Sequence, residues 1–186
     1  KRPQSHYRDC VWGISRAPYI AVHDPALHGK AIAISQWGWP DVMANWNWPG
    51  QEGKPCTVDI YSADDEVILL LDGREVGRKA AGQANRYLAS FEMAYRPGRL
   101  EAVGLKAGNE QARTVLETAG APAAIRLAAD RSLLDRGFGD LAYVAVEVVD
   151  GKGCRVPTAT NRLVFAACGE GCLLAVGNGD PTSEEP

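Results

Sequence analysis

Alternation of apolar and polar residues dominates the chain after residue 18. The apolar residues recur at every second position in short segments, which is the period of a β-strand with one buried face. Typical turn residues such as Asp72-Gly73 and Pro97-Gly98 separate these segments every eight to twelve residues or so, as in a β-sandwich. The pattern predicts strands at 19–22, 32–36, 57–61, 66–71, 74–79, 87–93, 100–105, 113–118, 124–129, 141–149, 162–167 and 173–176.

Only the start of the chain has a helical pattern. Tyr7, Val11 and Ile14 follow one another at i, i+4 and i+7, and Pro3 suits a first helical turn. We therefore predict a helix within residues 1–16. A helix this short is marginal unless it packs on something, and no second helix is predicted for it to join. We expect its natural partner to lie upstream, so that here the helix frays or packs on a neighbouring molecule.

The strand pattern is interrupted once by a linker. Residues 118–122 are small, contain Gly120 and Pro122, and have little to bury. The prediction is an all-β chain of two tandem immunoglobulin-like β-sandwich modules at residues 17–118 and 119–186, preceded by the short helix. The second module is shorter than the roughly 100 residues of an immunoglobulin-like sandwich. We expect it to be truncated, with an exposed strand edge.

Composition narrows the classes of function. The formal net charge of the 186 residues is −3 and the charges are scattered, which does not indicate a nucleic-acid-binding surface. No apolar run approaches the roughly 20 residues of a membrane-spanning helix. The five cysteines, an odd number at irregular spacing, do not form a disulfide framework. Cys168 and Cys172 could close a small loop, but all three histidines lie before residue 30, so we predict no metal and no cofactor.

Residues 37–55 contain the strongest candidates for a ligand contact. Four of the five tryptophans fall there, interleaved with asparagine, proline and glycine, which is typical of a loop or strand edge. A sugar ring stacks on an indole while amides bond its hydroxyls, so one interpretation is a carbohydrate contact. The other is structural, because tryptophan is highly buried on average. The candidate contact residues are Trp37, Trp39, Asn45, Trp46, Asn47, Trp48 and Glu52.

Catalytic motifs are missing from the sequence. There is no Gly-Xaa-Ser-Xaa-Gly elbow, no phosphate-binding glycine loop followed by a helix and no His-Glu-Xaa-Xaa-His. Adjacent acids such as Asp64 and Asp65 fall in predicted turns, where their side chains project apart, whereas a glycosidase pair must flank one bond. We predict no catalytic residue in this chain.

Three groups of residues resemble the C-terminal part of bacterial glycoside hydrolase family 2 enzymes of the β-galactosidase type. Residues 2–9 with Trp12 resemble the last helix of that family's catalytic (β/α)₈ barrel. Residues 45–53, 58–62 and 69–77 resemble the sandwich module after the barrel, and residues 127–130, 140–150 and 177–181 resemble the next immunoglobulin-like module. Ala63 and Asp72 stand where the family usually has asparagine. Aspartate suits a type I′ turn as well, whereas Ala63 removes a turn-forming side chain.

The resemblance implies a role and a partner. The family hydrolyses terminal β-galactosides with retention, using two glutamates of the barrel, and neither glutamate is among these residues. The chain would be a non-catalytic accessory region that supports the barrel and shapes its substrate cleft, in a periplasmic or secreted enzyme. Two alternatives stay open, namely an independent carbohydrate-binding module that uses the Trp37–Trp48 cluster, and a purely structural spacer. Solvent-exposed indole rings would favour carbohydrate binding, and indole rings buried beneath the sheet would favour a structural role.

Overall fold

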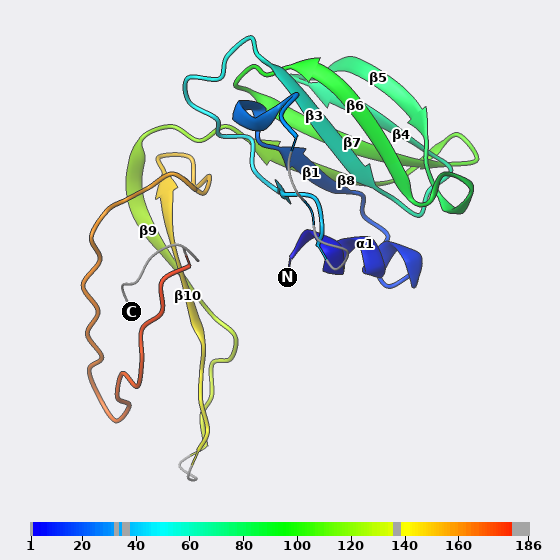
Figure 1. Cartoon of the computed structure of the whole chain (residues 1–186). Helices are drawn as coiled ribbons and strands as arrows, with labels where there is room; N and C mark the ends of the chain where they lie inside the picture. Colours follow the sequence, from blue (N-terminus) through cyan, green and yellow to red (C-terminus); the bar gives the residue numbers. More distant parts are fainter. Residues whose placement is uncertain (1, 32–33, 35–37, 136–138, 180–186) are drawn as a thin grey trace.

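The computed structural model describes residues 2–31, 34, 38–135 and 139–179. Two four-stranded sheets pack face to face, one helix lies against them, and a two-stranded hairpin extends away from the sandwich (Figure 1). The elements are α1 Pro3–Val11, β1 Tyr19–His23, η1 Pro25–Leu27, β2 Val42–Met43, β3 Pro55–Tyr61, β4 Glu66–Leu71, β5 Arg74–Ala80, η2 Gln83–Asn85, β6 Leu88–Ala94, β7 Arg99–Lys106, β8 Asn109–Glu117, β9 Pro122–Ala129 and β10 Val144–Asp150. The predicted all-β class is confirmed.

The sandwich consists of an antiparallel sheet in the order β2-β1-β3-β6 and a second in the order β5-β4-β7-β8. Their alternate apolar residues meet in one core, which includes Ile20, Ile60, Leu69, Phe91 and Leu100. This is the physical meaning of the period-2 pattern, because successive side chains of a strand point to opposite faces. At the β4–β5 hairpin, Asp72 and Gly73 have φ of 51° and 75°, the positive values that a type I′ turn requires.

Helix α1 packs on the sandwich of this chain, so the expectation that it frays or packs on a neighbouring molecule is wrong. It packs on the outer face of the first sheet, where Cys10 is buried together with Ala21, Val42 and Tyr61. The Tyr7 hydroxyl donates a hydrogen bond of 3.0 Å to the carbonyl of Arg86. The sequence pattern marked the inner face of these strands as the buried one. Aromatic side chains on the outer face supply a second apolar surface for the helix.

Among the described residues after 120, strand pairing is limited to the hairpin of β9 and β10 and an isolated bridge between Val149 and Arg155. The ladder of the hairpin runs from Val144↔Ala129 to Asp150↔Pro122, and every residue of β9 is exposed. The predicted strands at 162–167 and 173–176 are wrong, since these residues are irregular and largely exposed. A strand exists only through its ladder partners, and these segments have none among the described residues. The predicted strand at 32–36 falls mostly outside the described residues. The module boundaries at 16 and 118 stay predictions.

Candidate functional site

The tryptophans of the loop before β3 do not form an exposed row. Trp46 is 0% exposed and lies in the sandwich core, edge-on to Tyr95 with ring centroids 4.9 Å apart. Trp48 is partly buried against the same core. Trp39 packs beside α1, and its indole N–H donates to the Tyr61 hydroxyl at 3.2 Å. Trp37 lies outside the described residues. No ring face of Trp46 is therefore available for stacking on a sugar.

Two of these indoles have an unusual feature. Within the described residues, Nε1 of Trp46 and Nε1 of Trp48 are buried without a hydrogen-bond acceptor. A buried donor without an acceptor costs about 1–3 kcal/mol. The apolar packing of the large rings must outweigh this cost, which shows how strongly the loop depends on them for its position.

Asn45 and Asn47 fasten the loop to the linker between the sandwich and the hairpin. The Asn45 carbonyl oxygen Oδ1 accepts from the backbone N–H of Asn47 at 2.9 Å, so the loop turns tightly. The Asn47 Oδ1 accepts from the backbone N–H of Ala119 at 2.7 Å. The Thr118 hydroxyl donates to the carbonyl of Trp46 at 2.6 Å. The amide groups proposed for sugar hydroxyls thus serve a joint inside the protein.

A second set of contacts joins the linker to the turn after β10. One carboxylate oxygen of Asp150 accepts from the N–H of Gly120 at 2.7 Å, and the other accepts from Lys152 and Cys154 at 2.8 and 2.9 Å. These backbone donors hold the pKa of Asp150 below its usual range. The Cys154 thiol donates to Glu117 at 3.1 Å, which raises the pKa of the thiol. We call this set of contacts, from Asn47 through the linker to the turn, the inter-module joint.

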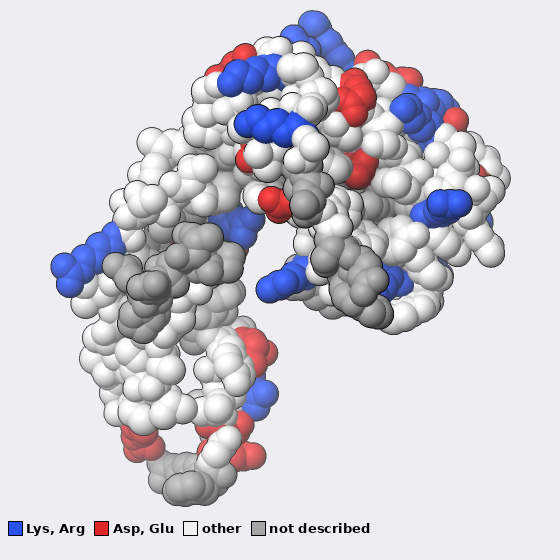
Figure 2. Space-filling view, viewed as in Figure 1, with Lys and Arg blue, Asp and Glu red and all other residues white. Residues whose placement is uncertain are grey.

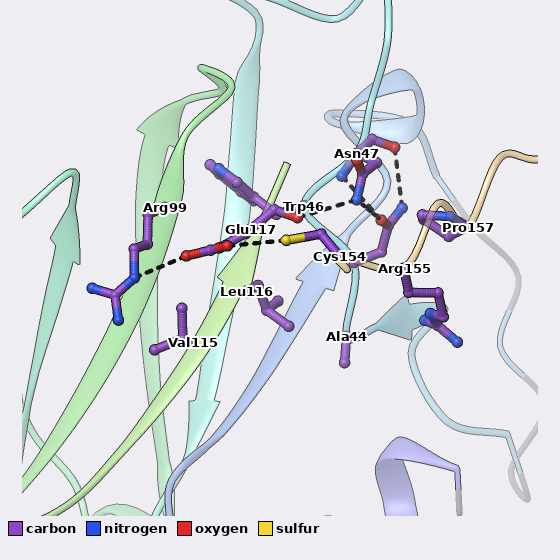
Figure 3. Close-up of a pocket in the computed structure, with 11 residues that line it drawn as sticks. Ala44, Trp46, Asn47, Arg99, Val115, Leu116, Glu117, Cys154, Arg155 and Pro157 are labelled. Atoms are coloured by element: carbon purple, nitrogen blue, oxygen red, sulfur yellow. Dashed lines mark hydrogen bonds and ion pairs between the residues drawn. The ribbon is translucent and has the colours of Figure 1, made fainter. Parts of the chain in front are cut away.

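A hollow of about 430 Å³ opens beside the joint (Figure 3). The loop at 44–47, the end of β8 and the turn at 154–157 provide its lining, which has an apolar part and a charged part. Glu52, the remaining candidate for a sugar contact, does not line it. The Glu52 side chain is exposed, and it accepts from the N–H of Gly50 at 3.3 Å. Asn45, Trp46 and Asn47 are thus the predicted site residues that the fold brings to one cavity.

A polar cluster on the outer face of the first sheet was missed by the sequence analysis. His23 Nε2 and Asp59 Oδ2 lie 2.8 Å apart, and the Ser90 hydroxyl donates to the other oxygen of Asp59. Beside them, His28 Nε2 lies 3.1 Å from Glu92. The alternation predicts that Asp59 points outward from the strand. The strand register that brings it beside His23 has no signature in the sequence.

The His23–Asp59 pair makes the stability of the sandwich depend on pH. The hydrogen bond to Asp59 raises the pKa of His23, so the pair stabilises the fold fully below about pH 6.5 and this contribution is lost as the pH rises through the raised pKa. We expect the stability gap between the wild type and His23→Gln to shrink by about 0.5–1 kcal/mol over this range. Urea denaturation at several pH values measures the gap.

An internal control tests whether Asp59 is the cause. Asp59→Asn removes the charge that favours the protonated imidazole, so in this background His23→Gln should no longer change the pH dependence. Wild-type and His23→Gln curves that run parallel with pH would contradict the assignment.

The described residues contain no group of three histidine, cysteine, aspartate or glutamate side chains that could hold a metal ion. Among them there is also no helix long and apolar enough to cross a membrane. The carboxylates of the described site either bind backbone N–H groups, as Asp150 does, or pair with arginine, as Glu117 does. The carboxylates of the site are therefore suited to holding segments of the chain together.

Two family models match the chain. Residues 125–186 match a model described as glycoside hydrolase family 2 C-terminal domain 5. Residues 53–112 match a model described as a domain of unknown function, DUF4982. The two matched regions follow each other along the chain and together include the sandwich strands from β3 to β7 and most of the hairpin.

Among curated proteins, the chain is similar to a β-galactosidase from Bacteroides ovatus, at 35% identity over 181 residues, which is 92% of this chain and 21% of that protein. It is 30% identical to a β-glucuronidase from Formosa agariphila over 132 residues, or 69% of this chain and 13% of that protein. The chain thus spans about a fifth or less of these relatives.

A solved structure agrees with these relatives. The crystal structure of a glycosyl hydrolase family 2 member from Bacteroides cellulosilyticus has a TM-score of 0.72 and 38% identity to this chain. The match covers 83% of this chain and 20% of that one. Most of this chain therefore has a structural counterpart inside a larger chain.

Proposed function

Since the chain belongs to the C-terminal region of glycoside hydrolase family 2 enzymes, we propose that it is a non-catalytic accessory region of a β-galactosidase-like enzyme and that it supports the catalytic barrel. The similarity to the Bacteroides ovatus β-galactosidase over 92% of the chain carries this proposal. In the proposed enzyme that contains this chain, the barrel supplies two glutamates for retaining hydrolysis of terminal β-galactosides. The accessory region fixes the position of the barrel wall.

Helix α1 and the residues after it support this role. The helix packs on the sandwich through Tyr7 and Cys10. At its C-terminal end Trp12 and Ile14 are 68% and 65% exposed, and Val11 is 38% exposed. Contiguous exposed apolar side chains of this size mark an interaction surface. In our proposal this surface packs against the barrel, so that α1 is held between the barrel and the sandwich.

The burial of the tryptophans bears on the alternative roles. Trp46 belongs to the core and the two asparagines belong to the joint, so the described part of the Trp37–Trp48 cluster acts as internal support. This favours the accessory role over an independent module that binds sugars through exposed indoles. A purely passive spacer gives no reason for the uncovered side chains of Trp12 and Ile14.

Substitution of Ile14 tests the proposed interface. In the enzyme that carries this chain, Ile14→Glu places a charge in the interface, and we expect a loss of about 1–3 kcal/mol in barrel stability. In the 186-residue chain alone the same change should have almost no effect, because Ile14 is exposed there. Calorimetry of the enzyme, together with residual hydrolysis of aryl β-galactoside and aryl β-glucuronide after heating, measures the outcome.

Val76→Glu is the matched control, because Val76 is an exposed apolar residue on the edge strand β5, away from α1. An enzyme whose stability responds equally to both changes, or to neither, would contradict the interface. Hydrolysis of the glucuronide alone would remove the galactoside part of the proposal and leave the accessory role in place.

A further inference from the structure

The hollow at the inter-module joint has the size and lining of a small-ligand site. Its volume of about 430 Å³ lies within the range of ligand pockets in proteins. Val115, Leu116 and Pro157 give it an apolar part, while Arg99, Glu117 and Arg155 give it charge. Residues of the sandwich and of the turn after β10 both line it, so it is complete only when the joint is closed. Figure 3 shows the lining residues, with Arg99 and Arg155 at opposite sides of the view.

The charge of the hollow is unbalanced. Arg99 is neutralised, because its guanidinium bonds Glu117 at 3.0 Å and Glu101 at 2.5 Å. The second oxygen of Glu117 accepts from the Cys154 thiol. Arg155 makes no ion pair within the described residues. Two arginines and one glutamate therefore line the hollow, which leaves one positive charge in a chain whose formal net charge is −3.

The backbone at Arg155 is held by the fold, while its side chain is exposed. Its backbone forms a bridge with Val149, and the N–H of the next residue, Val156, donates to the carbonyl of Val148 at 2.8 Å. A guanidinium on an ordered backbone loses less freedom when it binds a ligand. Its planar fork of donors matches a carboxylate or a sulfate group.

The asparagines of the hollow cannot supply this recognition. Their amide NH2 groups, which would have to donate to an anion, already donate within the protein, Asn45 to the carbonyl of Asn47 at 3.2 Å and Asn47 to the Asn45 amide oxygen at 3.2 Å and the carbonyl of Glu117 at 3.4 Å. Among the described lining residues, Arg155 is the arginine that makes no ion pair, and the lining also has an apolar part. Such a combination suits a ligand with an apolar face and one anionic group, which describes an acidic sugar.

We propose that the hollow at the inter-module joint binds a monosaccharide unit that carries a carboxylate or a sulfate, and that Arg155 holds its anionic group. That the ligand is a sugar rests on the proposed function, whereas the preference for an anion rests on the lining alone.

Isothermal titration of the 186-residue chain with glucuronic acid, galactose 6-sulfate, galactose and inorganic sulfate tests the proposal. We expect an acidic sugar to bind with Kd on the order of 1 mM and neutral galactose to bind at least about tenfold more weakly. Arg155→Gln should weaken the acidic sugar about tenfold or more, and Arg155→Lys should weaken it less, because lysine keeps the charge but loses the fork. Arg74→Gln, at an exposed arginine in the β4–β5 hairpin, should leave binding unchanged.

Each arm has a result that overturns the proposal. Absence of binding for both acidic sugars, or binding that Arg155→Gln leaves unchanged, removes the site. If galactose binds as tightly as glucuronic acid, the anionic group does not contribute to recognition. If inorganic sulfate binds as tightly as galactose 6-sulfate, the hollow binds the sulfate group and does not recognise the sugar ring. None of these readings involves hydrolysis, so a failure here is separate from a failure of the accessory role.

Discussion

Trp46→Ala is expected to destabilise the sandwich by about 3–5 kcal/mol, the usual cost of replacing a fully buried tryptophan or phenylalanine by alanine. The Trp46 side chain is completely buried among residues of both sheets and lies edge-on to Tyr95. Its removal leaves a cavity that the surrounding strands cannot fill without losing their register. A change of this size is a large fraction of the stability of a typical domain. Guanidinium denaturation of the 186-residue chain, followed by circular dichroism, measures it.

Trp46→Phe is the matched control. It keeps an aromatic ring in the core and removes the indole N–H, which has no acceptor among the described residues. Because the gain from removing that donor offsets part of the lost packing, we expect a cost of about 1 kcal/mol. A loss below about 1 kcal/mol for Trp46→Ala would contradict the core position and reopen the stacking role of this residue.

Gly104→Ala is expected to cost about 1–3 kcal/mol, although alanine is usually the better residue within a strand. A Cβ at this position would lie 1.9 Å from Oδ2 of Asp64 and 3.0 Å from its Cγ. The Asp64 carboxylate is buried, which raises its pKa, and it accepts a hydrogen bond from Ser62 at 3.3 Å. It therefore cannot move aside without leaving its partner. Urea denaturation at neutral pH measures the loss.

A double-mutant cycle isolates the cause of this loss. In the Asp64→Ala background the space beside Gly104 is free, so Gly104→Ala should cost less than about 0.5 kcal/mol. Gly77→Ala serves as a second comparison, because a Cβ there would meet only the Phe91 ring at 3.4 Å, an ordinary contact. Equal losses for Gly104→Ala with and without Asp64 would show that the carboxylate is not the obstacle.

The sequence identified the segment that holds the candidate site but not the contacts of its side chains, because local patterns report only on neighbouring residues. The composition of residues 37–55 identified a segment of special importance, and three of its candidates, Asn45, Trp46 and Asn47, do line one hollow. The Asn47 amide oxygen accepts from the backbone N–H of Ala119, 72 residues away, and the Asn45 amide oxygen accepts from the N–H of Asn47, so a sugar contact of these amides stays a prediction. The sequence does not single out Arg155, because an isolated arginine in a turn belongs to no recognisable motif.

The sequence by itself determined the elements whose cause is local. The period-2 strands of the sandwich and the type I′ turn at Asp72-Gly73 depend on side-chain alternation and on backbone freedom at two residues, both readable from neighbours. Tertiary structure alone decided which tryptophan fills the core, that α1 packs on an outer sheet face, that His23 meets Asp59, and that residues 162–176 are irregular. Each of these depends on strand register or on the availability of a partner. Such contacts join segments distant along the chain, whereas alternation reports only which face of one strand is buried.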